Sequence, residues 1–109
     1  MTKREELGSL EHIVLLAVMR LGEEAYGITV RREIASTTGR DLSIGAIYAT
    51  LVRLESKGFV TSFAGEPTAE RGGRAKRYFR VTGNGKAVLR NAHEIIMKMS
   101  AGIKGLGAT

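Results

Sequence analysis

The stretch SIGAIYATLVRLESKG, residues 43–58, is the most informative part of this 109-residue chain. Ser43 can cap a helix that runs to about Lys57, and Gly58 ends it. Along one side of this helix, apolar side chains recur at helical spacing, so we expect that side to face a hydrophobic core. These side chains are Ile44, Ile47, Leu51 and Leu54.

The opposite side of this helix has small residues where a surface helix usually carries Glu and Lys. Small side chains allow close approach to another surface, and Arg53 adds positive charge at one end. This side is therefore a candidate contact surface. It consists of Gly45, Ala46, Ala49 and Arg53, with Tyr48 and Val52 at one margin and Thr50 at the other.

Two further helices are expected before this one. Ser9 can cap the first, which ends at Gly22, and its apolar residues cover more than one side. Such a helix either lies at the centre of its domain or also packs on another chain. The second runs from residue 26 or 27 to residue 37 or 38, with Gly39 as its stop. Only residues 40–42 separate it from the next helix.

Two short strands are expected after residue 58. They cover residues 59–64 and 75–81, which are rich in aromatic and β-branched side chains, and a polar, Gly-containing loop joins them. Together they form a β-hairpin with a basic tip and flank. Phe59, Phe63 and Phe79 are expected to form the core of this hairpin rather than platforms for base stacking.

A last helix is expected after Thr82, which can cap it. Its apolar residues are spaced alternately three and four apart, as in a coiled-coil seam: Leu89, Ala92, Ile96, Met99 and Ile103. Two heptads are too few for a stable isolated coiled coil, so this seam must dock on its own domain or on a second subunit. The Gly-rich tail, residues 102–109, is expected to fray.

The composition excludes several classes of protein. The length fits one domain, and a chain without Cys has no disulfide framework, thiol catalyst or Cys-ligated zinc. His12 and His93 are far apart in the sequence and form no ligand cluster. The longest apolar run, residues 13–19, is too short to cross a bilayer, and the polar N-terminus lacks a signal-like cleavage site. We therefore expect a cytoplasmic protein without a membrane partner.

The net charge of +6 is concentrated in one segment of the chain. Residues 59–90 have seven Lys and Arg against two Asp and Glu, whereas residues 1–40 have six of each kind. A basic segment favours a polyanionic partner, although such a run can also be only a solvated face.

Three helices followed by a β-hairpin is the order of a winged helix-turn-helix domain. In that fold the third helix presents its face to the DNA major groove, and the hairpin brings cations to phosphates or into a minor groove. We therefore predict a mostly α fold with a small β-hairpin. A winged helix-turn-helix DNA-binding domain is expected over residues 1–82, and one C-terminal dimerisation helix with a frayed tail over residues 83–109.

Several motifs, taken in order, resemble the PadR-like family of transcriptional regulators, from about Ser9 to Leu89. Two departures are Ala49, where the family has Pro after the Tyr, and residues 24–25, where it has Gly-Pro. Both affect local rigidity more than chemistry. The motifs are Tyr26-Gly27, residues 43–58, Lys76-Arg77-Tyr78-Phe79-Arg80-Val81-Thr82 and Gly85-Lys86.

The resemblance implies a homodimer that binds a pseudo-palindromic operator in double-stranded DNA, commonly as a repressor, and that dimerises through its last and first helices. The predicted DNA contacts are Ser43, Gly45, Ala46, Tyr48, Ala49, Thr50, Arg53, Arg71, Arg74, Lys76 and Arg77. The predicted dimer contacts are Leu10, Val14, Leu89, Ala92, Ile96, Met99 and Ile103.

Two of these side chains have a second interpretation. Tyr48 either packs its ring on the base of the hairpin while its hydroxyl reaches a phosphate, or is only a half-buried packing residue. Arg53 is either a phosphate clamp or an ion-pair partner of a nearby carboxylate such as that of Glu55.

Other functions are open from the sequence. The basic face could be only solvated on a protein-interaction module, or the chain could bind nucleic acid without sequence preference as an architectural protein. An enzyme is not expected, because no nucleophile–base pair, carboxylate pair or metal set is present, and no cofactor is predicted. Some members of the family release DNA on binding a small aromatic molecule through Trp, which this chain lacks, so a small-molecule effector is left open.

Overall fold

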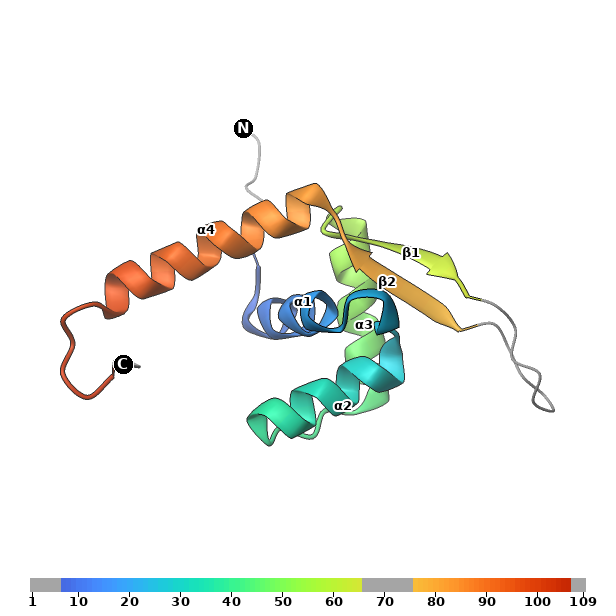
Figure 1. Ribbon diagram of the computed structural model, residues 1–109, viewed down its shortest axis with the longest axis horizontal. Helices are drawn as coiled ribbons and strands as arrows, with labels where there is room; N and C mark the ends of the chain where they lie inside the picture. The colour runs from blue at the N-terminus through green and yellow to red at the C-terminus, as the bar shows by residue number, and fades with distance from the viewer. Residues whose placement is uncertain (1–6, 66–75, 107–109) are drawn as a thin grey trace.

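The structure is a computed structural model that describes residues 7–65 and 76–106. Its elements follow the predicted order of three helices, a hairpin and a last helix, which confirms the winged helix-turn-helix fold with a C-terminal helix. In Figure 1 the first three helices lie together, the hairpin projects to one side and the last helix to the other. The elements are α1 (Ser9–Leu21), a 3₁₀ turn (Gly22–Glu24), α2 (Gly27–Thr38), α3 (Ile44–Ser56), β1 (Val60–Ala64), β2 (Arg77–Val81) and α4 (Gly83–Ser100).

Local chemistry sets most of the helix ends. The Ser43 hydroxyl accepts a hydrogen bond from the Ala46 N–H at 3.1 Å, and the Thr82 hydroxyl accepts one from the Gly85 N–H at 3.0 Å. Both caps are confirmed. Gly39 follows α2 with a φ of 79°, a left-handed conformation that Gly adopts without the steric cost of a Cβ.

The start of α1 differs from the prediction. Ser9 is the first residue of the helix, and Gly8 precedes it as the N-cap. The Gly8 N–H donates to a carboxylate oxygen of Glu11 at 2.8 Å, so Glu11 caps the N–H of the N-cap residue, and no Ser9 hydroxyl caps the helix.

Helix α1 lies at the centre of a single hydrophobic core. It contacts α2, α3, β2 and α4, which explains why its apolar residues cover more than one side. Burial of each large apolar side chain contributes about 1.5–3 kcal/mol of transfer free energy. The buried set is Val14, Leu15, Ala17, Val18, Ala25, Val30, Ile34, Ile47, Leu51, Leu54, Phe59, Val60, Phe79, Val81 and Leu89.

The hairpin has one buried face and one outer face. β1 and β2 pair antiparallel, and the face with Phe79 and Val81 packs into the core. Phe63 pairs with Tyr78 on the outer face, so its predicted place in the core is wrong. The segment before α2 extends this sheet, because the Phe79 N–H donates to the Ala25 carbonyl at 2.9 Å.

Helix α4 begins against this core and then leaves it. Gly85 is buried, and a Cβ at this position would clash with the Phe59 carbonyl and lie 2.8 Å from Val81 Cγ1. Leu89, one turn later, is also buried. The rest of the helix runs outward in Figure 1. In the described part of the chain, no helix is long and apolar enough to span a membrane.

Candidate nucleic-acid interface

One face of α3 is exposed and carries small or apolar side chains. Gly45, Tyr48, Ala49 and Val52 are all exposed, and their spacing places them along one stripe of the helix. Val52 is 60% exposed, more than Tyr48 at 39%. The predicted site omits Val52 because an apolar residue at the margin of the wheel resembles a core residue. Its spacing of three and seven from Ala49 and Gly45 is the signal that identifies it.

Ser43 and Ala46 lie at the start of this face. Ser43 is exposed but already caps the helix, and Ala46 is half-buried. Thr50 is a wrong prediction, because its side chain is completely buried. Its hydroxyl donates to the Ala46 carbonyl at 2.8 Å and accepts from the Arg53 guanidinium at 3.2 Å. Thr50 is therefore an internal residue of the domain and offers no surface for a contact.

Tyr48 packs against the start of α2. Its ring covers Gly27, the first residue of α2, so closely that a Cβ on Gly27 would clash with it. This contact agrees with the interpretation of Tyr48 as a packing residue, and its contact with the base of the hairpin stays a prediction. The contact of its hydroxyl with a phosphate stays a prediction.

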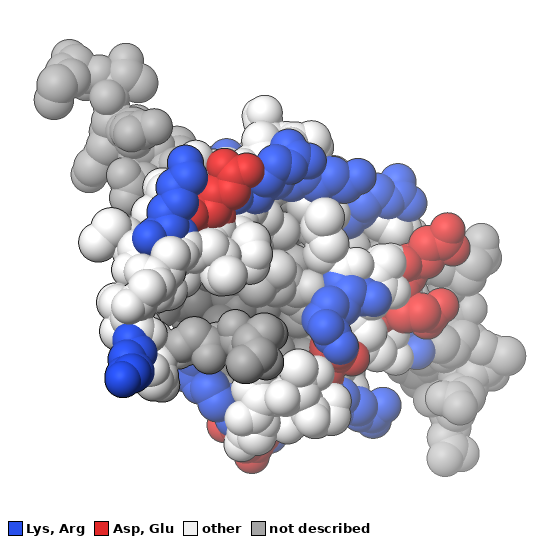
Figure 2. Space-filling model, turned by 60° about the vertical axis from the view of Figure 1, so that its left-hand side comes forward, with Lys and Arg blue, Asp and Glu red and all other residues white. Residues whose placement is uncertain are grey.

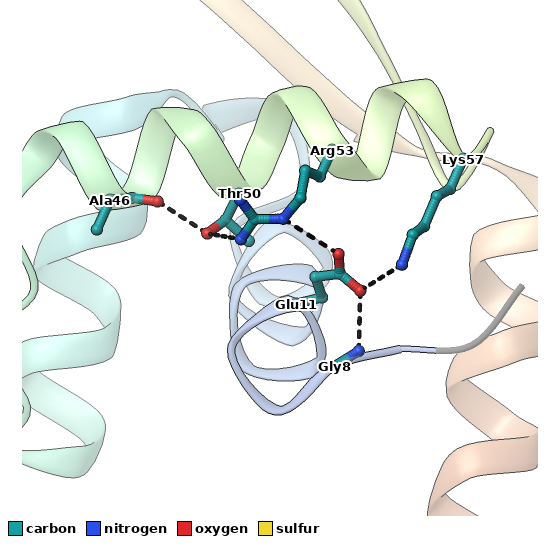
Figure 3. A network of polar contacts seen from close by, with 6 residues as sticks. All are labelled: Gly8, Glu11, Ala46, Thr50, Arg53 and Lys57. Carbon is teal, nitrogen blue, oxygen red and sulfur yellow. Dashed lines mark hydrogen bonds and ion pairs between the residues drawn. The ribbon is translucent and has the colours of Figure 1, made fainter.

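Arg53 and Lys57 join α3 to the start of α1 through one carboxylate (Figure 3). Glu11, whose side chain is only 7% exposed, accepts from Lys57 Nζ at 2.8 Å and from Arg53 Nε at 3.3 Å. Burial of Glu11 opposes its ionisation, but the hydrogen bonds from Lys57 and the Gly8 N–H outweigh this effect and hold the pKa of the carboxyl below its usual value. The carboxylate is therefore charged and links the two helices.

The two interpretations of Arg53 are partly resolved. Its ion-pair partner is Glu11, forty-two residues away in sequence, and not Glu55, which accepts from the Ser62 hydroxyl at 2.7 Å. The Arg53 side chain is still 53% exposed, so its predicted contact with a phosphate stays a prediction.

The outer face of the hairpin carries two cations that rest on aromatic rings. Lys76 Nζ lies 4.7 Å from the centre of the Tyr26 ring, and Arg80 Cζ lies 4.9 Å from the centre of the Phe63 ring. Lys76 and Arg77 are both exposed, as a phosphate contact requires. The predicted contacts Arg71 and Arg74 lie outside the described residues.

The predicted dimer contacts divide into three groups by exposure. The predictions for Val14 and Leu89 are wrong, because both side chains are buried in the core of their own chain and offer no surface to a partner. Leu10 and Ala92 are half-buried. Ile96, Met99 and Ile103 are all more than half exposed. Figure 2 brings the α4 side of the molecule forward and shows Lys and Arg, with a few Asp and Glu, around a region of uncharged side chains.

The two His residues of the chain lie on different helices. His12, on α1, is half-buried, and burial together with the charge of His93 on α4 lowers its pKa. Within residues 7–65 and 76–106, no three His, Cys, Asp or Glu side chains are placed to hold a metal ion.

Comparison with known proteins gives one family and a set of related folds. The family model described as the transcriptional regulator PadR-like family matches residues 15–91. No curated protein matches the chain.

Similar solved structures include a PadR family transcription regulator from hypervirulent Clostridium difficile R20291, 22% identical, with a TM-score of 0.70 over 85% of this chain and 95% of that one. A padr family transcriptional regulator from Eggerthella lenta DSM 2243 is 26% identical, with a TM-score of 0.69 over 85% and 80%. A transcriptional regulator from Clostridium thermocellum is 22% identical, with a TM-score of 0.69 over 84% and 85%.

Proposed function

Because this chain belongs to the PadR-like family of transcriptional regulators, we propose that it binds an operator sequence-specifically as a homodimer and acts as a repressor. The observation that carries this proposal is the exposed face of α3, where Gly45, Ala49 and Val52 occupy positions that charged side chains fill on an ordinary surface helix. Small and apolar side chains let the helix approach base edges and thymine methyl groups in the major groove.

Phosphate contacts come from the cations around this face. Lys76 and Arg77 lie at the start of β2, at the root of the hairpin loop, and Arg53 lies at the far end of α3. Arg71 and Arg74 in that loop complete the proposed set. Such contacts contribute sequence-independent affinity and orient α3 for base contacts.

The homodimer is supported by the second half of α4. Ile96 and Met99 are 57% and 73% exposed, and a partner's apolar surface would remove both from water. A two-fold dimer places two α3 helices on half-sites about 34 Å apart, one turn of B-DNA, which corresponds to a pseudo-palindromic operator.

The decisive experiment is a titration of the purified protein against duplex DNA from its own upstream region and against a scrambled duplex, at several salt concentrations. Preferential binding with a steep salt dependence supports a sequence-specific regulator. Equal binding to both duplexes would favour an architectural nucleic-acid binder. Absence of binding at low salt would favour a protein-interaction module.

A pair of substitutions tests the wing contacts. Lys76→Ala with Arg77→Ala should lower the slope of log affinity against log salt by about two. Arg90→Ala, which removes an exposed cation from α4, is the matched control and should leave the slope unchanged. An unchanged slope in the double variant would contradict the wing assignment.

A further inference from the structure

Three aromatic rings form a continuous stack on the outer face of the hairpin. The Tyr26 and Tyr78 rings meet edge to face with centroids 5.2 Å apart, and the Tyr78 and Phe63 rings stack at 5.8 Å. We call these three residues the aromatic stack. Aromatic pairs of this geometry contribute interaction free energy in addition to that from the area they bury. The aromatic stack can therefore hold a side chain that packs on either of its end rings.

A cation lies on each end of the aromatic stack. Lys76 rests on Tyr26 and Arg80 rests on Phe63, both within the distance at which a ring attracts a cation. A Lys side chain has four rotatable bonds and loses considerable entropy when a ligand immobilises it. A ring that already holds the ammonium reduces that loss and so increases affinity for the ligand.

The Lys76 end of the aromatic stack is formed by Tyr26, which lies next to the residue that α3 contacts through Tyr48. Tyr26 immediately precedes Gly27, and the Tyr48 ring of α3 lies on Gly27. Contacts therefore link Tyr48 of α3, through the buried Gly27, to Tyr26, whose ring carries Lys76. Arg80 is four residues further along β2, about 13 Å away.

We propose that Tyr26 is a positioning residue for DNA binding, whose ring holds the Lys76 ammonium as a fixed phosphate contact between α3 and the hairpin. This inference rests on the proposed function. It adds a residue that does not itself touch DNA and acts only through Lys76.

The backbone of Tyr26 can be separated from its ring. Its N–H donates to the Thr29 hydroxyl and its carbonyl accepts from the Val30 N–H, both at 2.9 Å. A side-chain substitution leaves these bonds at the start of α2 in place. Tyr26→Leu therefore removes the ring, and Tyr26→Phe keeps the ring while removing the hydroxyl.

The test is a double-mutant cycle on binding to a duplex of arbitrary mixed sequence at low salt, because phosphate contacts do not depend on sequence. Tyr26→Leu should weaken binding about two- to fivefold, and Tyr26→Phe should bind like the wild type. Lys76→Met should lower the salt slope by about one. Adding Tyr26→Leu to Lys76→Met should then cause no further loss.

Phe63→Leu is the matched control, since it shortens the same aromatic stack at the end away from Lys76. It should not weaken binding. Equal losses from Phe63→Leu and Tyr26→Leu, or a Tyr26→Leu loss that persists in the Lys76→Met background, would overturn the proposal. If the wild type binds no duplex at any salt concentration, the proposed function fails and this inference fails with it.

A measurement without any variant guards against misfolding of Tyr26→Leu. The Tyr26 ring current should shift the NMR signals of the Lys76 ε-methylene protons upfield in the free protein. Signals at the ordinary position of a solvated Lys would overturn the proposal, even where the binding data agree with it.

Discussion

The two halves of α4 both carry apolar side chains, more of them in the outer half, but only the inner half buries any of its residues. In the inner half, residues 83–91, Gly85 and Leu89 are buried against the hairpin and α1. In the outer half, residues 92–100, Ile95, Ile96 and Met99 are all more than half exposed. The difference shows that only the inner part of this apolar seam packs within the chain, and that its outer part is left exposed.

The outer half has little of its own to hold it in a helix. It extends about 13 Å beyond the contacts of the inner half. Isolated helices of nine residues are unstable in water, so the outer half depends on the turn before it and on any surface that covers its apolar residues. In the proposed dimer that surface is a second copy of the chain.

The largest expected effect comes from charging the outer half. Ile96→Glu with Met99→Glu should weaken dimerisation roughly a thousandfold, because two carboxylates would have to be desolvated on association. Light scattering after size exclusion should then give the mass of a monomer, with the melting temperature of wild-type protein diluted until its dimer dissociates. Lys98→Glu, at another exposed position of the outer half, is the control for charge alone. A double variant that keeps the mass of a dimer would contradict the assignment of the outer half of α4 to the dimer interface.

The next effect comes from filling the close contact of the inner half. Gly85→Ala places a Cβ against the Phe59 carbonyl and the Val81 side chain, so the start of α4 must shift. We expect a loss of about 3 kcal/mol in the free energy of unfolding, measured by urea denaturation. Gly83→Ala is the matched substitution, since no atom lies within 4 Å of the Cβ it would add. Equal stabilities for the two variants would show that the inner half is not tightly packed.

A third, smaller effect compares the truncation of a buried aliphatic side chain with that of an exposed one on the same helix. Leu89→Ala should cost about 2.5 kcal/mol of unfolding free energy, because a buried side chain is lost and a cavity remains. Ile95→Ala, the same truncation of an aliphatic side chain in the outer half, should cost less than about 0.5 kcal/mol in the monomer. Urea titrations measure both variants, at a protein concentration low enough to dissociate a dimer. A cost for Ile95→Ala close to that for Leu89→Ala would mean that the outer half folds back on its own chain.

The features that follow from neighbouring residues could be predicted from the sequence. Ser43 and Thr82 cap their helices, and Gly39 ends α2, because each depends on atoms within three or four residues. The order of elements follows from these ends and from apolar spacing. This order of elements was enough to predict a winged helix-turn-helix fold.

The features that depend on distant residues could not be predicted. Nothing near Val14 or Leu89 in the sequence indicates which of two apolar surfaces each one joins. Thr50 lies at the margin of the outer side on a helical wheel, but a hydrogen bond to Ala46 and the packing of α1 place it inside. The pairing of Arg53 with Glu11 joins elements that only the tertiary fold brings together.

The smallest expected effect tests the contact between α1 and the point where the two halves of α4 meet. The pKa of His12 is lowered by burial and by the charge of His93, so the folded chain favours neutral His12. The unfolded chain binds the proton more tightly. Above the unfolded pKa of about 6.5, His12 is neutral in both states and does not change the free energy of unfolding. Below that pH the unfolded chain takes up the proton more readily, so the free energy of unfolding falls.

This fall should be less than about 1 kcal/mol, because His12 is only partly buried and solvent screens its interaction with His93. Urea midpoints between about pH 7.5 and pH 5.5 measure it, a range above that in which Glu11 takes up a proton. His12→Gln should remove this part of the pH dependence, and His93→Gln should reduce it without removing it. If the urea midpoint of His93→Gln depends on pH as strongly as that of the wild type, burial of His12 alone accounts for the effect. The start of the outer half would then not lie close enough to α1 for the two His charges to interact.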